Sequence, residues 1–428
     1  MQPIKTYLKT KALHFIILLL GSIVLGYLLM VIAYAIPQSR LILGCANSVC
    51  TFEKEGAYPI VSDGYINTQL DNYTDGAMLN AALCSTGESP FIAAIKNCQY
   101  KYDDQNPMES FMSYIWQKEG THTIDYPRYW HGFLIVLKPL LLFFSYSDIR
   151  MINGLMQSIL LVLLLWTLAK KQLSQYILPV VLTTFYLVPS VLAMSLQYSS
   201  VYYIALLTTT VLLLFEDRLS EKQLIPELFL IAGILTSYFD LLTYPLITLG
   251  FPLVFAIILQ QRRRCTVKDT ILSVIGYSFC WGIGYVGMWS GKWLLSILFL
   301  GFSSFAAVTA SLQERSLNGA VTAGTSVMDT LISNIEMFKK PIYKILPFIM
   351  LLYTAIIGYR NKKEIHLINC IPFLMILCMP FAWYVVTANH AAVHTWFTHK
   401  TLCIAVLGFY CMLMSVVRPS EQQQSFTP

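Results

Sequence analysis

Long apolar segments separated by short polar connections dominate the chain. Each segment is long enough, or nearly long enough, to cross a bilayer as a helix, which takes about 20 residues. Ten such segments lie at residues 12–37, 149–168, 176–194, 202–215, 226–239, 243–259, 270–289, 343–359, 366–387 and 401–417. The pattern therefore predicts an all-α polytopic membrane protein with about ten transmembrane helices, forming one membrane domain over residues 1–428.

The composition agrees with this prediction. Hydrophobic residues make up 56% of the chain and charged residues only 12%, against roughly a quarter charged in soluble domains. This balance excludes a soluble protein. The net charge of +6 comes from Lys and Arg in short clusters between apolar segments, which is how membrane topology is encoded, so we expect a bilayer and no nucleic acid as partner.

The first apolar segment is expected to stay in the membrane rather than to be cleaved as a signal peptide. It follows Lys5, Lys9 and Lys11 and is longer than a signal core of about 7 to 15 residues. The nearest match to a cleavage pattern is Ala33-Tyr34-Ala35. We therefore predict a spanning helix with its N-terminus in the cytoplasm.

The connections alternate in charge along the chain. Those at residues 197–199, 239–241 and 388–390 have almost no Lys or Arg. The others are basic and contain Lys170 and Lys171, Arg218 and Lys222, residues 262–268, residues 360–363, and Arg418. Because short cytoplasmic loops carry the excess of Lys and Arg, we predict a multi-pass protein of the cell membrane with both termini in the cytoplasm.

This topology requires two further apolar stretches, residues 133–144 and 294–310, not to cross. The first is short and contains Lys138 and Pro139, and the second is interrupted at residues 301–304. Each is predicted to be an interfacial helix on the outer face, in the plane of the headgroups. Two long outer loops follow from this assignment, one over residues 38–148 and another over residues 290–340.

The first outer loop is rich in carboxylates and holds four cysteines. An even number of cysteines in an external loop is typical of disulfides in an oxidising compartment. The connectivity is open, and sequence proximity favours Cys45 with Cys50 and Cys84 with Cys98. The six remaining cysteines show no metal-type spacing, so we expect no structural zinc site.

Three carboxylates of this loop are candidates for acid or base chemistry: Asp63, Asp71 and Asp75. An apolar run begins just after Asp75 and predicts a helix, so Thr74 or Asp75 is expected at its N-cap. Residues four apart share a helix face. A carboxylate near an apolar surface has a raised pKa and can act as a general base, although capping by Asp75 and solvation of Asp71 explain the pattern equally well.

Cations and aromatic rings supply a second set of candidates. Arg128 and His131 flank Trp130 at the predicted membrane boundary, where an arginine fork or a histidine can face a phosphate and an aromatic ring can stack on a sugar. An aromatic belt at the interface is the alternative explanation. The last outer connection contains His390 and His394, four residues apart without a third ligand of characteristic spacing.

Arg315 is the charged candidate of the second long loop. A cation there can clamp a phosphate, or it is a solvated loop residue. All of these candidates, from Asp63 to His394, fall on the predicted outer side. Carboxylates with phosphate-binding cations at a bilayer surface indicate a substrate with a lipid tail, a phosphate and a group to be transferred.

In this plan the chain resembles the GT-C class of polytopic glycosyltransferases. The resemblance lies in a first spanning helix followed at once by an acidic outer loop, with Asp63, Asp71 and Asp75, then many spans and a late outer loop with a cation, Arg315. Residues 70–76 and 126–132 are also similar to segments of bacterial members that decorate envelope polysaccharides.

The resemblance implies transfer of a hexose or pentose from a polyprenyl-phosphate-linked donor to a glycan or lipid-linked acceptor on the outer face, usually with inversion. Asp71, with Asp75 or Asp63 as second choices, would take the acceptor proton. Arg128, His131, Arg315 and the histidines 390 and 394 would hold the departing phosphate. No cofactor is required, because the leaving group is already a phosphate; a divalent metal is compatible with the site.

Other classes remain open at this stage. A transporter or flippase of a lipid-linked saccharide would carry ionisable residues within the spans and internal repeats. A polysaccharide ligase or polymerase would concentrate arginine in the large outer loop. A membrane-bound acyltransferase would use His131 or His394 as its base.

Overall fold

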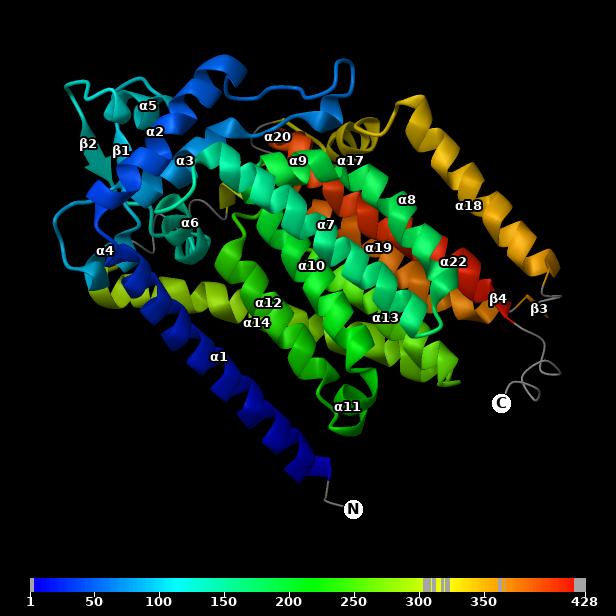
Figure 1. Cartoon of the computed structure of the whole chain (residues 1–428). Helices are drawn as coiled ribbons and strands as arrows, with labels where there is room; N and C mark the ends of the chain where they lie inside the picture. The colour runs from blue at the N-terminus through cyan, green and yellow to red at the C-terminus, as the bar shows by residue number, and fades with distance from the viewer. Residues whose placement is uncertain are drawn as a thin grey trace.

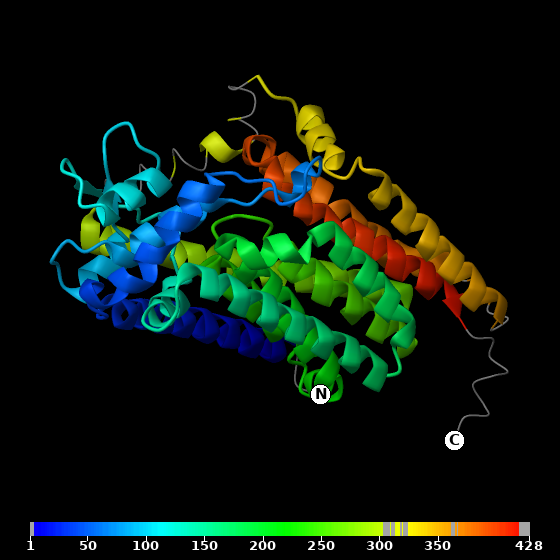
Figure 2. The ribbon, with the colours of Figure 1, turned by 45° about the horizontal axis from the view of Figure 1, so that its top comes forward.

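A computed structural model of the chain describes residues 4–302, 309, 313–316, 319, 324–360, 364–365 and 367–418. Long helices run roughly side by side, and a cap of short elements covers one end of them (Figure 1). Figure 2 shows the same division from a second direction, with the cap at one end of the helices. The structure is therefore that of a polytopic helical membrane protein with a folded cap at one end of its helices.

Within the described part of the chain, seven helical segments are long and apolar enough to cross a membrane. They are built from α1 (Ile4–Tyr34), α7 (Tyr146–Lys170), α10 (Leu196–Leu214), α14 (Val267–Leu300), α18 (Pro341–Arg360), η3 (Leu367–Cys370) with α19 (Ile371–Val386), and α21 (Thr395–Thr398) with η4 (His399–Leu402) and α22 (Cys403–Val416). Three shorter apolar segments are η2 (Ser174–Tyr176) with α8 (Ile177–Leu187), α12 (Ile225–Phe239) and α13 (Ile247–Arg262). These elements cover all ten predicted segments; the number that cross the membrane stays a prediction.

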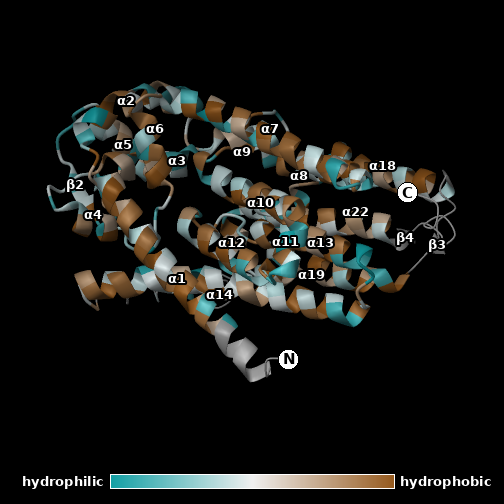
Figure 3. Cartoon of the chain, turned by 60° about the horizontal axis from the view of Figure 1, so that its bottom comes forward, coloured by the Kyte–Doolittle hydropathy of each residue, from teal (hydrophilic) through white to brown (hydrophobic). Residues whose placement is uncertain are grey.

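The centre of the bundle is made by α10, α12 and α13, whereas α1 and α18 expose apolar side chains along much of their length. Figure 3 shows hydrophobic residues along the described part of α1 and hydrophilic residues gathered at α11 (Glu216–Glu221). Helices α12 and α14 approach closely because Gly233 faces the carbonyl of Trp281 and Gly284 faces that of Leu230. Small residues permit such backbone approach in membrane helices.

The basic connections come together at the end of the bundle opposite the cap. Arg262 donates to the carbonyl of Lys171 at 2.7 Å, and Arg263 pairs with Glu216 at 3.1 Å. Near the start of α1, Lys11 pairs with Glu227. The strands β3 (Glu364–Ile365) and β4 (Val417–Arg418) form a short antiparallel pair at the same end. The two described ends of the chain thus lie toward this end of the bundle; the side of the membrane on which the termini lie stays a prediction.

The predicted first outer loop is the folded cap. Its elements are α2 (Gln38–Glu55), η1 (Ile66–Thr68), α3 (Asn72–Leu83), α4 (Pro90–Lys96), β1 (Gln99–Lys101), α5 (Pro107–Ile115), β2 (His122–Ile124) and α6 (Leu134–Leu141). β1 and β2 pair antiparallel, with Gln99 opposite Ile124. α6 is about 12 Å long at 1.5 Å per residue, which is too short to cross a membrane.

One cysteine pairing is confirmed and the other is wrong. Cys84 and Cys98 form a disulfide, and Cys45 and Cys50 are free. Both free thiols belong to α2, where a separation of five residues rotates the side chains by about 140°. Cys45 consequently faces the core and Cys50 faces outward, so the two sulfur atoms cannot meet.

Two predicted segment boundaries also need correction. The expected interfacial helix at 294–310 is not separate at its start, because α14 continues without a break to Leu300; residues 303–308 and 310–312 lie outside the described residues. The expected helix at 176–194 is divided into α8 and α9 (Pro189–Met194). Val188 adopts a left-handed conformation there with φ 54°, and Pro189 provides no amide hydrogen to continue the α8 ladder.

The remaining short helices lie near the cap. α17 (Val327–Glu336) packs against α20 (Ala388–Val393). Asn334 donates to the carbonyl of Ala391 at 2.9 Å, and Thr330 donates to that of Ala388 at 3.2 Å. These bonds fix the connection that contains His390 against the second long loop.

Candidate functional site

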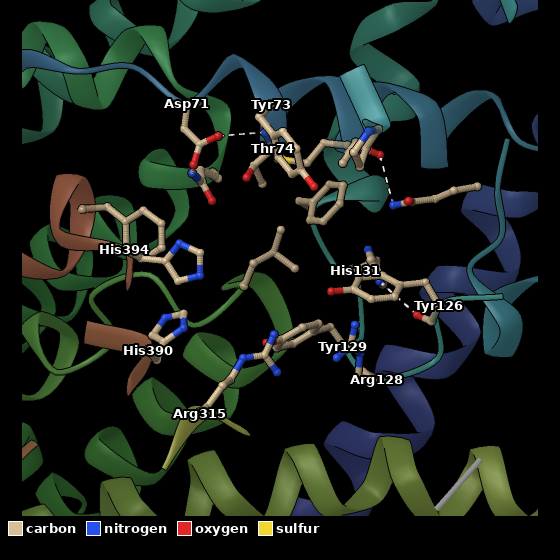
Figure 4. Close-up of a pocket in the computed structure, with 18 of the residues that line it drawn as sticks. Asp71, Tyr73, Thr74, Tyr126, Arg128, Tyr129, His131, Arg315, His390 and His394 are labelled. Carbon is tan, nitrogen blue, oxygen red and sulfur yellow. Dashed lines mark hydrogen bonds between the residues drawn. The ribbon is translucent and has the colours of Figure 1, made fainter. Parts of the chain in front are cut away.

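A polar cavity of about 490 Å³ lies between the cap and the Lys- and Arg-poor connections of the bundle. Gln197, Leu241 and His390 come from the three predicted outer connections, and all three line it. Figure 4 shows the cavity with side chains from both the cap and the bundle around it. Its charged and imidazole-bearing lining residues are Asp71, Asp125, Arg128, His131, Arg315, His390 and His394.

The N-cap of α3 is Asp71, and the prediction of Thr74 or Asp75 for this position is wrong. The Asp71 side chain accepts a hydrogen bond from the Thr74 amide at 2.8 Å. Aspartate is among the best N-cap residues because it satisfies an amide that has no partner within the helix. The predicted solvation of Asp71 is also wrong, since its side chain is only 1% exposed.

The Asp71 carboxylate lines the cavity and is oriented by hydrogen bonds from three residues. Its Oδ1 accepts from Thr74, and its Oδ2 accepts from Gln197 Nε2 at 2.5 Å and Trp396 Nε1 at 3.0 Å. The Thr74 side chain adds a further hydrogen bond to this carboxylate. Burial raises the pKa of the Asp71 carboxyl above its ordinary value, and these donors offset only part of that effect. A buried carboxylate with a raised pKa at the wall of a cavity is suited to accept a proton.

Asp75 has a structural position behind the cavity. It accepts hydrogen bonds from Tyr146 Oη at 2.6 Å and from the Leu196 and Gln197 amides at 2.9 and 3.3 Å. The side chain is fully buried and does not line the cavity. Asp75 therefore caps the N-terminus of α10, whose own N-cap residue, Ser195, makes no side-chain cap. Burial raises the pKa of Asp75 to about 7.

Two other predicted site residues lie outside the cavity. Asp63 is exposed on the loop before η1 and is not brought to Asp71. Trp130 is 1% exposed, and its indole donates to the carbonyl of Met288 at 2.7 Å. The ring thus fastens the cap to α14, and its burial excludes the expected stacking on a sugar.

Both candidate arginines line the cavity, although they are far apart in sequence. The carbonyl of Arg128 accepts from Trp289 and Trp293 of α14 at 2.9 and 3.2 Å. The Arg315 segment is held by Asn389, which donates to the carbonyl of Glu314 at 2.6 Å. Two guanidinium groups in one cavity can bind a phosphate with bidentate hydrogen bonds.

The predicted histidines are brought to the cavity, but not as cations. Burial lowers the pKa of His131 and of His390 to about 3, and that of His394 to about 4. Positive charge on Arg315 acts in the same direction on His390 and His394. At neutral pH the three imidazoles are therefore neutral, so Arg128 and Arg315 carry the positive charge among the predicted phosphate ligands.

Several lining residues were not predicted as site residues. Gln197 and Trp396 donate directly to Asp71, and Tyr73 and Asp125 line the same cavity. Gln197 had one usable signal, since it lies in a connection without Lys or Arg. Nothing local in the sequence marks Tyr73 or Asp125.

A second, apolar cavity of about 330 Å³ adjoins the polar one and opens between α6, α7, α10 and α12. Met78 and Phe133 line both cavities. The other walls are apolar side chains with few polar groups, including Leu137, Ile204 and Phe239. This arrangement joins an apolar groove, through Met78 and Phe133, to the cavity that the carboxylate and the two arginines line.

Metal ligation has no support from clustering in the described residues. No group of three or more His, Cys, Asp or Glu side chains is placed there to hold a metal ion. The use of a divalent metal therefore stays a prediction. Comparisons with family models, with characterised proteins and with solved structures find no match to this chain.

Proposed function

We propose that this protein is a glycosyltransferase that moves a sugar from a polyprenyl-phosphate donor to a hydroxyl of an envelope glycan or lipid acceptor, on the outer face of the membrane. One observation carries the proposal: Asp71, Arg128 and Arg315 line a single polar cavity that shares two side chains with an apolar groove. A lipid phosphate needs this combination, with cations for the headgroup and an apolar surface for the chain.

The chemistry assigns a role to each of these groups. The carboxylate of Asp71 takes the proton of the acceptor hydroxyl, and the acceptor oxygen forms a bond to the anomeric carbon. The bond between that carbon and the phosphate oxygen breaks, and its electron pair leaves with the polyprenyl phosphate. Arg128 and Arg315 stabilise the negative charge that develops on the phosphate as this bond breaks.

The surroundings of Asp71 fit the role of base. Trp396 and Gln197 donate to Oδ2, which orients the carboxylate at the wall of the cavity. The raised pKa of Asp71 makes it a stronger base than an exposed aspartate. Asp75 is excluded as the base because it does not line the cavity and binds α10 and Tyr146 instead.

The test is the Asp71→Asn variant, reconstituted in bilayers and supplied with a radiolabelled polyprenyl-phosphate sugar and envelope acceptors, together with glycan analysis of intact cells. Asparagine is as good an N-cap as aspartate, so the fold is expected to persist. Loss of the base should lower the transfer rate by about 100- to 10,000-fold. The matched control is Asp63→Asn, an exposed carboxylate outside the cavity, which should keep the wild-type rate.

Unchanged glycan modification by a normally expressed Asp71→Asn protein would contradict the proposal. A lipid-saccharide flippase would need the arginines but not a base. Loss of glycan modification in Arg128→Gln and Arg315→Gln, with full retention in Asp71→Asn, would therefore support the flippase instead.

A further inference from the structure

Two histidines of the polar cavity are held in a defined tautomer by backbone carbonyls. His131 Nε2 lies 3.2 Å from the carbonyl oxygen of Tyr126, and His390 Nε2 lies 2.7 Å from that of Leu242. A carbonyl only accepts hydrogen bonds, so the facing nitrogen of a neutral imidazole carries the proton. In both rings Nδ1 is consequently left with a lone pair.

The backbone that orients these rings is strained. His131 has φ 55° and Leu242 has φ 65°, a left-handed conformation that is unfavourable for residues other than glycine. Each strained residue is held by neighbouring bonds. The amide of Gly132 donates to the Tyr238 carbonyl at 3.0 Å, and the Asp240 carboxylate accepts from the Thr243 amide at 3.0 Å. The fold thus stabilises an uncommon conformation at both carbonyl–imidazole contacts or beside them.

Nδ1 of all three cavity histidines, His131, His390 and His394, is buried without a hydrogen-bond partner in the described part of the chain. The His131 and His390 side chains are only 3% and 6% exposed. Most buried polar atoms in proteins are paired, and an unpaired acceptor costs free energy. Since all three rings line one cavity, a molecule bound there can supply the missing donors.

The positive charge near His390 and His394 limits which hydrogen-bond donors can bind to their Nδ1 atoms. Arg315 lies close enough to His390 and His394 to oppose their protonation electrostatically, and the same positive field opposes a bound metal cation. The described residues also offer no group of three metal ligands. Neutral hydroxyl groups are donors that this field does not repel. A molecule with several hydroxyl groups can reach rings on both sides of the cavity, where Figure 4 shows His390 and His394 opposite His131.

We propose that Nδ1 of His131, His390 and His394 forms the sugar-binding subsite of the cavity, by accepting hydrogen bonds from hydroxyl groups of the sugar on the lipid phosphate. Arg128 and Arg315 bind the phosphate beside it. The inference rests on the proposed function and deepens it. It separates the cavity into a set of neutral acceptors for the sugar and a set of cations for the phosphate.

The test compares the affinity of the full-length protein for two probes by native mass spectrometry from detergent. One probe is a polyprenyl phosphate that carries a hexose or a pentose, and the other is the same polyprenyl phosphate without the sugar. Each substitution His390→Phe or His394→Phe keeps an aromatic ring and removes the acceptor. We expect about three- to tenfold weaker binding of the sugar-bearing probe, as for one neutral hydrogen bond, and an unchanged affinity for the bare lipid phosphate.

Matched variants keep the test decisive. His122→Phe changes an exposed histidine on β2, outside the cavity, and should alter neither affinity. His394→Asn places an amide oxygen near the position of Nδ1 and should recover most of the loss. His394 makes no side-chain hydrogen bond in the described chain, so its substitution is expected to preserve the fold even if His390→Phe does not.

Equal weakening of both probes would assign the histidines to the phosphate and overturn the inference. Wild-type affinity for the sugar-bearing probe in both phenylalanine variants would overturn it as well, and so would a wild-type protein that binds all sugar-bearing probes no more tightly than the bare lipid. The proposed function fails separately, through an unaffected Asp71→Asn enzyme.

Discussion

The buried carboxylate of Asp75 should make the stability of the protein depend on pH. Burial raises its pKa from 3.8 to about 7, although Arg150, Tyr146 and the Leu196 amide act in the opposite direction. In the unfolded chain this carboxyl ionises near its ordinary value. A raised pKa in the folded state stabilises the fold below pH 3.8, and this contribution is lost as the pH rises through about 7.

The size of the effect follows from the two pKa values. Between pH 5 and pH 8 the folded protein gives up the Asp75 proton, whereas the unfolded chain has already lost nearly all of it. Integration of this difference in bound protons gives a loss of about 2.5 kcal/mol in the free energy of unfolding. Asp75→Asn is neutral over the whole range, so its stability lacks this contribution.

The assay is unfolding by SDS in mixed micelles, followed by tryptophan fluorescence at pH 5, 6, 7 and 8. The free energy of unfolding of the wild-type protein minus that of Asp75→Asn should fall by about 2.5 kcal/mol from pH 5 to pH 8. Asp63→Asn, at an exposed position, controls for the removal of one carboxylate. A difference that stays constant or rises with pH would refute the reasoning, and would mean that the amides of α10, Tyr146 and Arg150 outweigh burial.

Two further predictions concern the cap and the base. Replacing Cys84 or Cys98 with Ser opens a loop closed over 14 residues and should lower the free energy of unfolding by about 3 kcal/mol, measured in the same SDS titration. The control is Cys50→Ser, at a free exposed thiol. Equal stability of all three variants would contradict the prediction. Trp396→Phe removes a hydrogen-bond donor from Asp71 Oδ2, which should raise the pKa of this carboxyl and move the acid limb of the pH–rate profile to higher pH by about one unit. An acid limb at the wild-type position would show that this donor does not affect the pKa of the base.

The sequence was sufficient for the helices because apolar length is a local property. All ten predicted segments coincide with helices or helical pairs of the bundle. The local hydropathy pattern gave a wrong helix boundary where tertiary contacts determine the length of the helix. The continuation of α14 through residue 300 depends on packing with the cap, where Lys292 donates to the carbonyls of Ala94 and Ile95 at 3.1 and 2.8 Å. The interruption in hydropathy at residues 301–304 does not predict this continuation of the helix.

Most residues of the candidate site were predictable from the sequence, but the protonation states of its histidines were not. Alternating charge in the connections brought Asp71, the arginines and the histidines to one side of the membrane in the prediction, and the structure places six of the nine predicted residues around one cavity. The state of the histidines was not accessible. His390 acquires its tautomer from Leu242, which lies 148 residues away in the sequence, and no spacing motif records such a contact.

The difference between Asp71 and Asp75 shows why their spacing alone was misleading. Residues four apart share a face only where both are helical, and Asp71 precedes the first turn with φ −127° and ψ 71°. Its side chain folds over the end of α3 to the Thr74 amide, while Asp75 lies within the first turn and binds the start of α10. One carboxylate thus lines the cavity, and the other is buried against α10 and Tyr146. The N-cap residue of α3, rather than the aspartate within its first turn, is therefore the carboxylate that a substrate in the cavity can reach.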